Sequence, residues 1–387
     1  MDKEARELKE IRDPREHHSV HELRDLHEPR DPKALELAQL LRGREGERHA
    51  VVMQDFPDPD AISCGIAYRL IAAEFGIEAE LIYGGRISHQ ENIALVSLLG
   101  IDLDQLPDTP IPAERFQGSV YVDGQGTTSH LTSRLEDAGV PVVAVVDHHE
   151  DQARLTPLFR DIRPVGACAS IFTHYLMTGL LPLRNAKVEH RRLATGLMHG
   201  ILSETNAMTR ALPFDFAAAA FLQPYWDADM LMEIMNQQRS HKVMEVIRLA
   251  LANRLTREGV CLSGVGYLRA EERDAIPQAA DFLLTEENVH TVIVFGLVSN
   301  SDGGESIQGS LRTIKATLSP DAFLKEALGR ARDGAWYGGG KMMAGGFEIP
   351  LGFLSGFDGE EMAEVKWEAY NSKVRKKIFD KIGVEDK

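Results

Sequence analysis

The chain has 387 residues, of which 43% are hydrophobic, and this length is sufficient for two ordinary domains with substantial cores. The net charge of -16, from 43 basic and 59 acidic residues, argues against long duplex nucleic acid as a partner, because an acidic surface repels a polyanion. No apolar stretch reaches the length of a membrane span, and the charged N-terminus lacks the apolar core of a signal peptide, so we expect a cytoplasmic protein that does not bind a membrane.

Residues 1–30 are dominated by charge and contain few apolar residues, which predicts a solvated N-terminal arm. From residue 31 to residue 254, helix and strand patterns alternate. This alternation predicts an α/β domain with a parallel sheet and helices on both of its faces. The predicted segments are helices at 34–41, 61–75, 95–99 and 131–137, strands at 49–53, 79–83, 119–122 and 142–146, and a mostly helical region at 168–254.

A second, smaller α/β domain is predicted at residues 255–387, facing the first across a cleft. Its strands are expected at 260–268, 291–297, 307–313 and 347–351, with helices at 274–284 and 360–381. The cysteines Cys64, Cys168 and Cys261 are too widely separated for a zinc motif, and we expect buried free thiols.

Acidic residues follow three predicted strands of the first domain. The apolar run at 142–146 leads into Asp147-His148-His149, the run at 51–53 precedes Asp58-Pro59-Asp60, and the run at 119–122 ends at Asp123. The carboxyl ends of parallel strands share one edge of a sheet, where open α/β folds bind ligands. Carboxylates bind hard divalent cations, and imidazole shifts the preference toward Mn²⁺ or another transition metal. We therefore predict a metal centre with two ions at this edge.

Each of these motifs also has a structural interpretation. Asp58 and Asp60 could cap the following helix, and Asp123 before a glycine is typical of a turn. His148 and His149 could be buried structural histidines. In the catalytic interpretation, Asp123 bridges the two ions, His148 is a ligand, and His149 contacts the substrate or protonates the leaving group.

The ordered set of motifs resembles the DHH phosphoesterase superfamily. The matching segments are P-D-P-D-A at 57–61, Asp123, D-H-H at 147–149 and G-I-L-S-E-T at 200–205. The C-terminal region resembles the DHH-associated substrate-binding domain, through G-S-L-R-T at 309–313 and the glycine-rich segment at 338–346. Within the superfamily the resemblance is to the nanoRNase and bisphosphonucleotide phosphatase branch, and it spans roughly residues 48–355.

The resemblance implies two metal positions. The implied ligands are Gln54, Asp58 and Asp123 for one ion, and Asp60, Asp123, His148 and Glu204 for the other. Gln54 stands where the family usually has histidine, and as a neutral donor it is expected to weaken the binding of that ion. Glu204 stands where aspartate is usual, and its additional methylene group is expected to move the ligand oxygen.

The resemblance also implies substrate-binding residues. Arg312 would clamp a phosphate, and the backbone N–H groups of Gly338, Gly339 and Gly340 would approach an anion closely. Lys341, where histidine is common, would still attract a terminal phosphate. The structural alternatives are an exposed salt bridge for the arginine and a tight surface turn for the glycines.

The resemblance implies three further candidates for substrate contact, Arg86, His89 and Asn92, which follow the predicted strand at 79–83. Helix capping by Ser88 is an equally good explanation for the polarity of this segment.

These expectations describe a divalent-metal-dependent phosphoesterase that hydrolyses short oligonucleotides or linear dinucleotides to nucleoside monophosphates. Mn²⁺ is the expected cofactor, with Mg²⁺ or Co²⁺ as alternatives. Several other activities stay open: 3',5'-bisphosphonucleotide phosphatase, cyclic dinucleotide phosphodiesterase and exopolyphosphatase-like activity. A nucleotide-binding protein with little turnover also stays open, because of Gln54, Glu204 and Lys341. A homodimer is expected by analogy alone.

Overall fold

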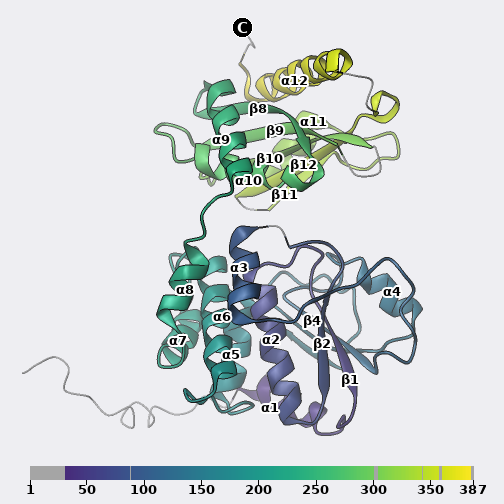
Figure 1. Cartoon of the computed structure of the whole chain (residues 1–387), viewed down its shortest axis with the longest axis vertical. Helices are drawn as coiled ribbons and strands as arrows, with labels where there is room; N and C mark the ends of the chain where they lie inside the picture. Colours follow the sequence, from purple (N-terminus) through teal and green to yellow (C-terminus); the bar gives the residue numbers. More distant parts are fainter. Residues whose placement is uncertain (1–30, 88, 300–303, 342, 357–359, 385–387) are drawn as a thin grey trace, which may run out of the picture. The chain divides into compact units, whose positions relative to one another are not determined.

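The computed structural model describes residues 31–87, 89–299, 304–341, 343–356 and 360–384 (Figure 1). The chain divides into two compact units, Met1–Gln237 and Gln238–Lys387. The predicted N-terminal arm and the predicted cap Ser88 lie outside the described residues. Among the helices that the structure describes, none combines the length and the hydropathy needed to cross a bilayer.

The first unit contains a six-stranded parallel sheet in the order β3-β2-β1-β4-β5-β6. Its strands are β1 (Arg48–Val52), β2 (Glu78–Tyr83), β3 (Asp104–Gln105), β4 (Gly118–Val122), β5 (Val142–Asp147) and β6 (Phe159–Ile162). Strand order reverses between β1 and β4, and in open α/β sheets such a reversal leaves a crevice at the carboxyl ends of the strands. The predicted parallel sheet is confirmed, and the acidic motifs follow the carboxyl ends of β1, β4 and β5, at and beside this reversal.

Helices cover both faces of this sheet. Successive residues of β1 point to opposite faces of the sheet and pack in two different cores. Val51 packs with α1, α2, α5 and α6, whereas Ala50 and Val52 pack with Leu131 and Leu135 of α4. The helices are α1 (Pro32–Leu41), α2 (Pro59–Glu74), α3 (Gln90–Leu99), α4 (Leu131–Asp137), α5 (Cys168–Met177), α6 (Val188–Glu204), α7 (Pro213–Leu222) and α8 (Ala228–Met235).

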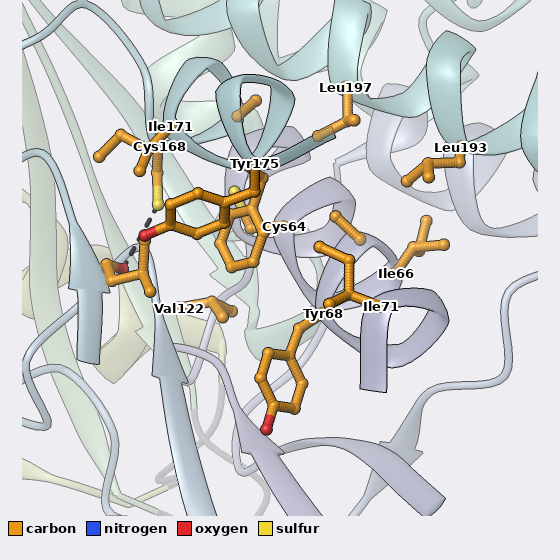
Figure 2. Packing of buried hydrophobic residues seen from close by; sticks show 14 of the residues in the cluster. Cys64, Ile66, Tyr68, Ile71, Val122, Cys168, Ile171, Tyr175, Leu193 and Leu197 are labelled. Atoms are coloured by element: carbon orange, nitrogen blue, oxygen red, sulfur yellow. Dashed lines mark hydrogen bonds between the residues drawn. The ribbon is translucent and has the colours of Figure 1, made fainter. Parts of the chain in front are cut away.

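Helix α2 is buried on most of its circumference, between the sheet and helices α5 and α6. Figure 2 shows Tyr68 and Ile71 of α2 in the same cluster as Tyr175 of α5 and Leu197 of α6. Gly200 of α6 lies so close to α2 that an added Cβ would meet Ser63 Oγ at 2.7 Å and Asp60 Cα at 3.1 Å. This close packing fixes the first turn of α2, which carries Asp60 and follows the cap residue Asp58.

The second unit is the smaller α/β domain that the sequence predicts. Its six-stranded sheet has the order β11-β12-β10-β9-β8-β7, with β8 and β9 parallel and the other pairs antiparallel. Helices α9 and α10 pack on one face, and α11 and α12 on the other. The strands are β7 (Leu255–Arg257), β8 (Val260–Arg269), β9 (Thr291–Ser299), β10 (Glu305–Thr313), β11 (Gly338–Gly340) and β12 (Ala344–Pro350), and the helices are α9 (His241–Asn253), α10 (Ala275–Leu283), α11 (Pro320–Leu328) and α12 (Glu360–Ile382).

The boundary between the units precedes the one expected from the sequence. The sequence predicts a boundary between residues 254 and 255, after helix α9, whereas the compact units meet between Gln237 and Gln238. The reason is that α9 buries Val243, Val246 and Ile247 in the same core as residues of β8 and α10. The helical pattern of residues 168–254 is continuous, so the sequence did not indicate on which unit α9 packs.

All three cysteines are free and buried, as expected. Cys64 and Cys168 belong to the core around α2 and are visible in Figure 2, whereas Cys261 lies in β8 of the second unit.

The close contact between α6 and α2 predicts a stability effect. Gly200→Val should lower the free energy of unfolding by about 1–3 kcal/mol, because the added side chain overpacks against α2. Urea denaturation measures this value. Ala217→Val, at an exposed position of α7, is the matched control and should cost less than about 0.7 kcal/mol. Equal losses in the two variants would contradict the steric argument.

Candidate metal centre

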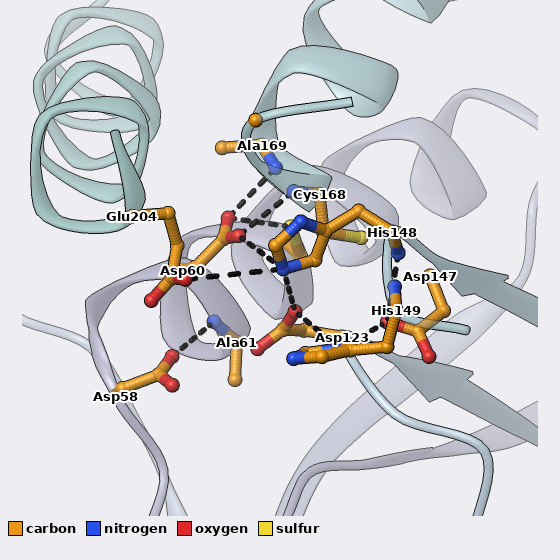
Figure 3. Close-up of polar contacts among 12 residues, drawn as sticks. Asp58, Asp60, Ala61, Asp123, Asp147, His148, His149, Cys168, Ala169 and Glu204 are labelled. Carbon is orange, nitrogen blue, oxygen red and sulfur yellow. Dashed lines mark hydrogen bonds and ion pairs between the residues drawn. The ribbon is translucent and has the colours of Figure 1, made fainter. Parts of the chain in front are cut away.

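Four predicted ligands converge at the carboxyl edge of the first sheet (Figure 3). His148 Nε2 lies 3.4 Å from Asp123 Oδ1, 3.9 Å from Asp60 Oδ2 and 3.9 Å from Glu204 Oε2. These residues come from the ends of β5 and β4, the first turn of α2 and the last turn of α6. The tertiary structure thus brings together side chains that are up to 144 positions apart in the chain, since residues 60 and 204 are both in the cluster.

The segment between β1 and α2 gives its two aspartates different surroundings. Asp58 is the N-cap of α2, and its Oδ1 accepts a hydrogen bond from Ala61 N at 2.9 Å. The capping interpretation is therefore correct for Asp58. Its Oδ2 accepts a hydrogen bond from Gln54 Nε2 at 2.7 Å, so these two predicted ligands contact each other directly.

Asp60 lies inside α2 and is fully buried, so the capping interpretation does not describe it. Its carboxylate accepts hydrogen bonds from the backbone N–H groups of Cys168 at 2.8 Å and Ala169 at 2.7 Å. These donors belong to the first turn of α5, whose helix dipole also favours a negative charge. The interaction fixes the direction of the carboxylate toward His148.

Asp123 has a left-handed backbone conformation, with φ of 53°. Asp adopts this conformation more readily than most residues, and the turn interpretation is correct to this extent. However, the side chain is buried, and its Oδ1 has no hydrogen-bond partner among the described residues. An unpaired buried carboxylate oxygen is costly, which indicates that another group is meant to contact it.

His148 is oriented by a backbone contact. Its Nδ1 lies 3.1 Å from the carbonyl oxygen of Val165, so Nδ1 carries the hydrogen and Nε2 faces the carboxylates. Nε2 is buried and forms no hydrogen bond with any of the described residues. An imidazole nitrogen and a carboxylate oxygen that are both buried and both unpaired fit the ligand set of a divalent metal ion.

His149 interacts mainly with an acid. Its Nδ1 donates a hydrogen bond to Asp147 Oδ1 at 2.8 Å and lies 3.8 Å from Asp123 Oδ1. Asp147 is buried, and its other oxygen accepts a hydrogen bond from Gln125 Nε2 at 2.8 Å. Burial would raise the pKa of Asp147, but the hydrogen bonds from His149 and Gln125 lower it overall. Asp123, His148 and His149 together form a compact group of potential ligands.

Burial and mutual repulsion raise the pKa values of the acidic groups. Burial, supplemented by the charge of Asp58, raises the pKa of Asp60 to about 6 and that of Glu204 to about 7. The same causes raise the pKa of Asp123 well above its ordinary value. Burial would lower the pKa of His148, but its contact with Asp123 and the nearby carboxylate charges raise it to about 10. The cluster therefore favours additional positive charge, which protons or a metal ion can supply.

The last turn of α6 presents Glu204 to the cluster with its side chain partly exposed. The chain then turns sharply, because Asn206, Ala207 and Met208 all have left-handed φ values. Such a run of strained non-glycine residues persists only where the surroundings impose it.

Arg86 and His89 are exposed in the segment between β2 and α3. A contact that the sequence did not predict holds this region: Glu91 of α3 pairs with the buried His199 of α6 at 2.6 Å. It ties the start of α3 to the helix that carries Glu204. No sequence signal marks this pair, because its members are distant in the chain.

In the second unit, Arg312 lines a cavity of about 540 Å³. The salt bridge considered for Arg312 is formed, since its Nε lies 2.8 Å from Asp281 Oδ1, and Nη1 donates to Ser310 Oγ at 2.7 Å. The cavity wall also includes Gly338 and Gly339, together with Arg273 and Trp336, which the sequence did not suggest.

Most of the glycine-rich segment at 338–346 is strand, in β11 and β12. Gly338–Gly340 form the edge strand β11, paired with Gly345, Gly346 and Phe347 of β12. A Cβ at Gly340 would lie 2.5 Å from the carbonyl oxygen of Ala344, so the absence of side chains permits the close pairing. Gly340 N donates to Asp321 Oδ1 at 3.3 Å, and Lys341 is exposed beyond the strand end.

Comparison of sequences finds similar proteins, each of which matches the chain over part of its own length. No protein-family model matches. An uncharacterised protein of Methanocaldococcus jannaschii is 37% identical over 335 residues, covering 85% of this chain and 63% of that protein. A probable manganese-dependent inorganic pyrophosphatase of Streptococcus mutans is 26% identical over 151 residues, covering 38% of this chain and 45% of that protein. The chain thus matches less than two thirds of the length of either relative.

Among solved structures, an exopolyphosphatase-related protein from Bacteroides fragilis superposes with a TM-score of 0.60 at 12% identity. The match covers 89% of this chain and 96% of that chain. The similarity shows that the two proteins share a fold.

The raised pKa values predict how the metal-free protein responds to pH. Asp60 and Glu204 have folded-state pKa values of about 6 and about 7, above their ordinary values of 3.8 and 4.5. At these two groups the folded state therefore binds more protons than the unfolded state, and their contribution to stability should fall as the pH rises from about 5 to about 8. Thermal unfolding in EDTA across this range measures the effect.

Glu204→Gln should reduce this pH dependence, and Mn²⁺ should counteract it in the wild type. Glu114→Gln, which changes an exposed acid of the same unit, is the control and should leave the profile unchanged. An unaltered profile in Glu204→Gln would show that the surroundings do not raise the pKa of Glu204.

Proposed function

We propose that the chain belongs to the DHH phosphoesterase superfamily and is a divalent-metal-dependent hydrolase of phosphate esters. The observation that carries this proposal is the convergence of Asp60, Asp123, His148 and Glu204. Two of their buried atoms, Asp123 Oδ1 and His148 Nε2, form no hydrogen bond with any described residue. The fold shared with an exopolyphosphatase-related protein and the partial match to a probable manganese-dependent pyrophosphatase support the same class of reaction.

Mn²⁺ is the proposed ion, because the cluster combines carboxylates with an imidazole. The proposed ligands are Asp60, Asp123, His148 and Glu204 for one ion, and Gln54, Asp58 and Asp123 for the other. When bound, such ions lower the pKa of water and neutralise charge on the phosphate group.

His149 is the proposed general acid. Because Nδ1 donates to Asp147, His149 acts as an acid in its imidazolium form, in which Nε2 carries the second proton and gives it to the leaving oxygen. Gln125 supports the arrangement by donating to Asp147 and to the carbonyl oxygen of Glu150 at 2.9 Å. His149 is thus held by a carboxylate in one orientation, as general acids and bases commonly are.

The proposed substrates are short oligonucleotides, including linear dinucleotides, cleaved to nucleoside monophosphates. In the second unit, Arg312 and the backbone of Gly338 and Gly339 offer a site for phosphate in a cavity whose wall also contains Trp336. The indole is partly exposed, and aromatic rings of this kind stack on nucleobases. The net charge of -16 disfavours long nucleic acids, whereas a short nucleotide needs only local cations. Arg86, His89, Gly340 and Lys341 stay candidate substrate contacts.

One observation favours a second candidate, a nucleotide-binding protein with little turnover. Gln54 donates to Asp58, so one predicted metal position is closed by a hydrogen bond between its own ligands. The bisphosphonucleotide, cyclic dinucleotide and exopolyphosphatase-like activities are alternatives that a substrate panel separates.

A panel assayed with Mn²⁺ tests the proposed function. It contains a linear dinucleotide, a longer RNA, 3',5'-bisphosphoadenosine, a cyclic dinucleotide and pyrophosphate. We expect the linear dinucleotide to have the highest kcat/KM.

His148→Ala should lower kcat/KM for the linear dinucleotide by more than about 100-fold, because the loss of a metal ligand costs more than the loss of a residue that only supports a ligand. His241→Ala, at an exposed position of α9, is the control. Tight nucleotide binding without Mn²⁺-dependent product release would favour the binding protein instead.

The role of Arg312 can be tested separately. Arg312→Ala should raise KM for the dinucleotide roughly 10- to 100-fold, since a hydrogen bond to a charged group contributes about 1.5–3 kcal/mol. Steady-state kinetics measure the change, with kcat expected to vary less. Arg248→Ala removes an exposed arginine that pairs with Glu245 in α9 and should leave KM unchanged. A similar KM in both variants would exclude Arg312 as a substrate clamp.

A further inference from the structure

The predicted metal ligands form two groups with different local contacts. In the first group, His148 Nε2 and Asp123 Oδ1 lie 3.4 Å apart, and neither atom has a hydrogen-bond partner in the described chain. Asp60 and Glu204 each bring a carboxylate oxygen within 3.9 Å of the same nitrogen. An ion entering here meets two ligand atoms that form no hydrogen bond, and Asp60 can keep its hydrogen bonds from the backbone of Cys168 and Ala169.

The second group is engaged in hydrogen bonds. Asp58 Oδ1 accepts from Ala61 N, and Asp58 Oδ2 accepts from Gln54 Nε2 at 2.7 Å. The amide N–H of Gln54 points at the carboxylate, and a cation is repelled by the positive end of that bond. An ion seated between these two side chains would therefore have to displace their hydrogen bond and turn the amide so that Oε1 faces it.

Charge separates the groups further. The first position is surrounded by three carboxylates, those of Asp60, Asp123 and Glu204, and by one imidazole. The second has the carboxylate of Asp58 and the neutral amide of Gln54, and in the proposed function it shares Asp123 with the first. Once a first ion has neutralised part of the charge on Asp123, the second position attracts a cation less strongly.

We propose that the chain binds its two ions in sequence. One divalent ion binds tightly to Asp60, Asp123, His148 and Glu204, and a second enters beside Asp58 only together with a phosphate group, whose oxygens supply the missing negative ligands. Gln54 is a positioning residue that holds Asp58 in the absence of phosphate. This inference rests on the proposed metal-dependent function and adds the order in which the ions bind.

Counting bound Mn²⁺ on the full chain tests the inference without measuring turnover. The protein is first stripped with EDTA, and the electron paramagnetic resonance signal of free Mn²⁺ is followed during titration. We expect one tight equivalent, with the second binding at least about 10-fold more weakly. Adenosine 5'-monophosphate, and separately inorganic phosphate, should raise the tight stoichiometry to two.

Substitution of Gln54 gives the sharpest test. Gln54→His replaces the amide with an imidazole, a better ligand for Mn²⁺, and should produce two tight equivalents without phosphate. Gln54→Ala should retain the first equivalent and leave the second weak. Gln237→His adds the same side chain at an exposed position outside the centre and should behave as the wild type.

The outcomes separate this inference from the proposed function. Two equally tight ions in the phosphate-free wild type, or a single tight ion in Gln54→His, would overturn sequential binding even if the protein hydrolyses dinucleotides. One tight ion in a protein that hydrolyses no phosphate ester would refute the proposed function and leave the binding order intact. Failure to bind any ion tightly would overturn both.

Discussion

The main physical constraint on the first unit is that its fold holds several buried carboxylates close together, with little positive charge between them. Asp60 and Asp123 are buried, Glu204 is partly buried, and His148 is the imidazole between them. Such a cluster repels itself, and burial increases the cost of each charge. The fold tolerates it because backbone N–H groups of α5 stabilise Asp60 and the carbonyl of Val165 orients His148. A divalent cation would neutralise the negative charge that remains in excess.

The architecture explains why the cluster forms at this place. The strand order reverses between β1 and β4, and open α/β sheets bind ligands at such a point, at the carboxyl ends of the strands. Asp123 follows β4 at this point in a left-handed conformation, and the close contact of Gly200 in α6 with α2 brings Glu204 and Asp60 near each other. Packing at some distance from the ligands thus sets the positions of the ligand atoms.

The two units offer different chemistry. The first contains the carboxylate and imidazole cluster, whereas the second contains a cavity with an arginine, backbone amides of glycines and an indole ring. A metal cluster alone does not distinguish one phosphate ester from another. In the proposed function, the second unit supplies that selectivity through contacts with phosphate and base. An acidic protein can still bind a short anionic substrate, because a short ligand is influenced mainly by the charges nearest to it.

The sequence by itself determined the α/β class and the strand-end acids, because hydrophobic periodicity and short motifs are local properties. Local chemistry also indicated the cap at Asp58 and the turn at Asp123. Only the tertiary structure decided that Asp60 is buried against α5, that Gln54 contacts Asp58, and that α9 packs with the second unit. It also decided that the glycine segment is an edge strand and that Glu91 pairs with His199. These features depend on which distant surfaces meet, and a linear pattern does not contain that information.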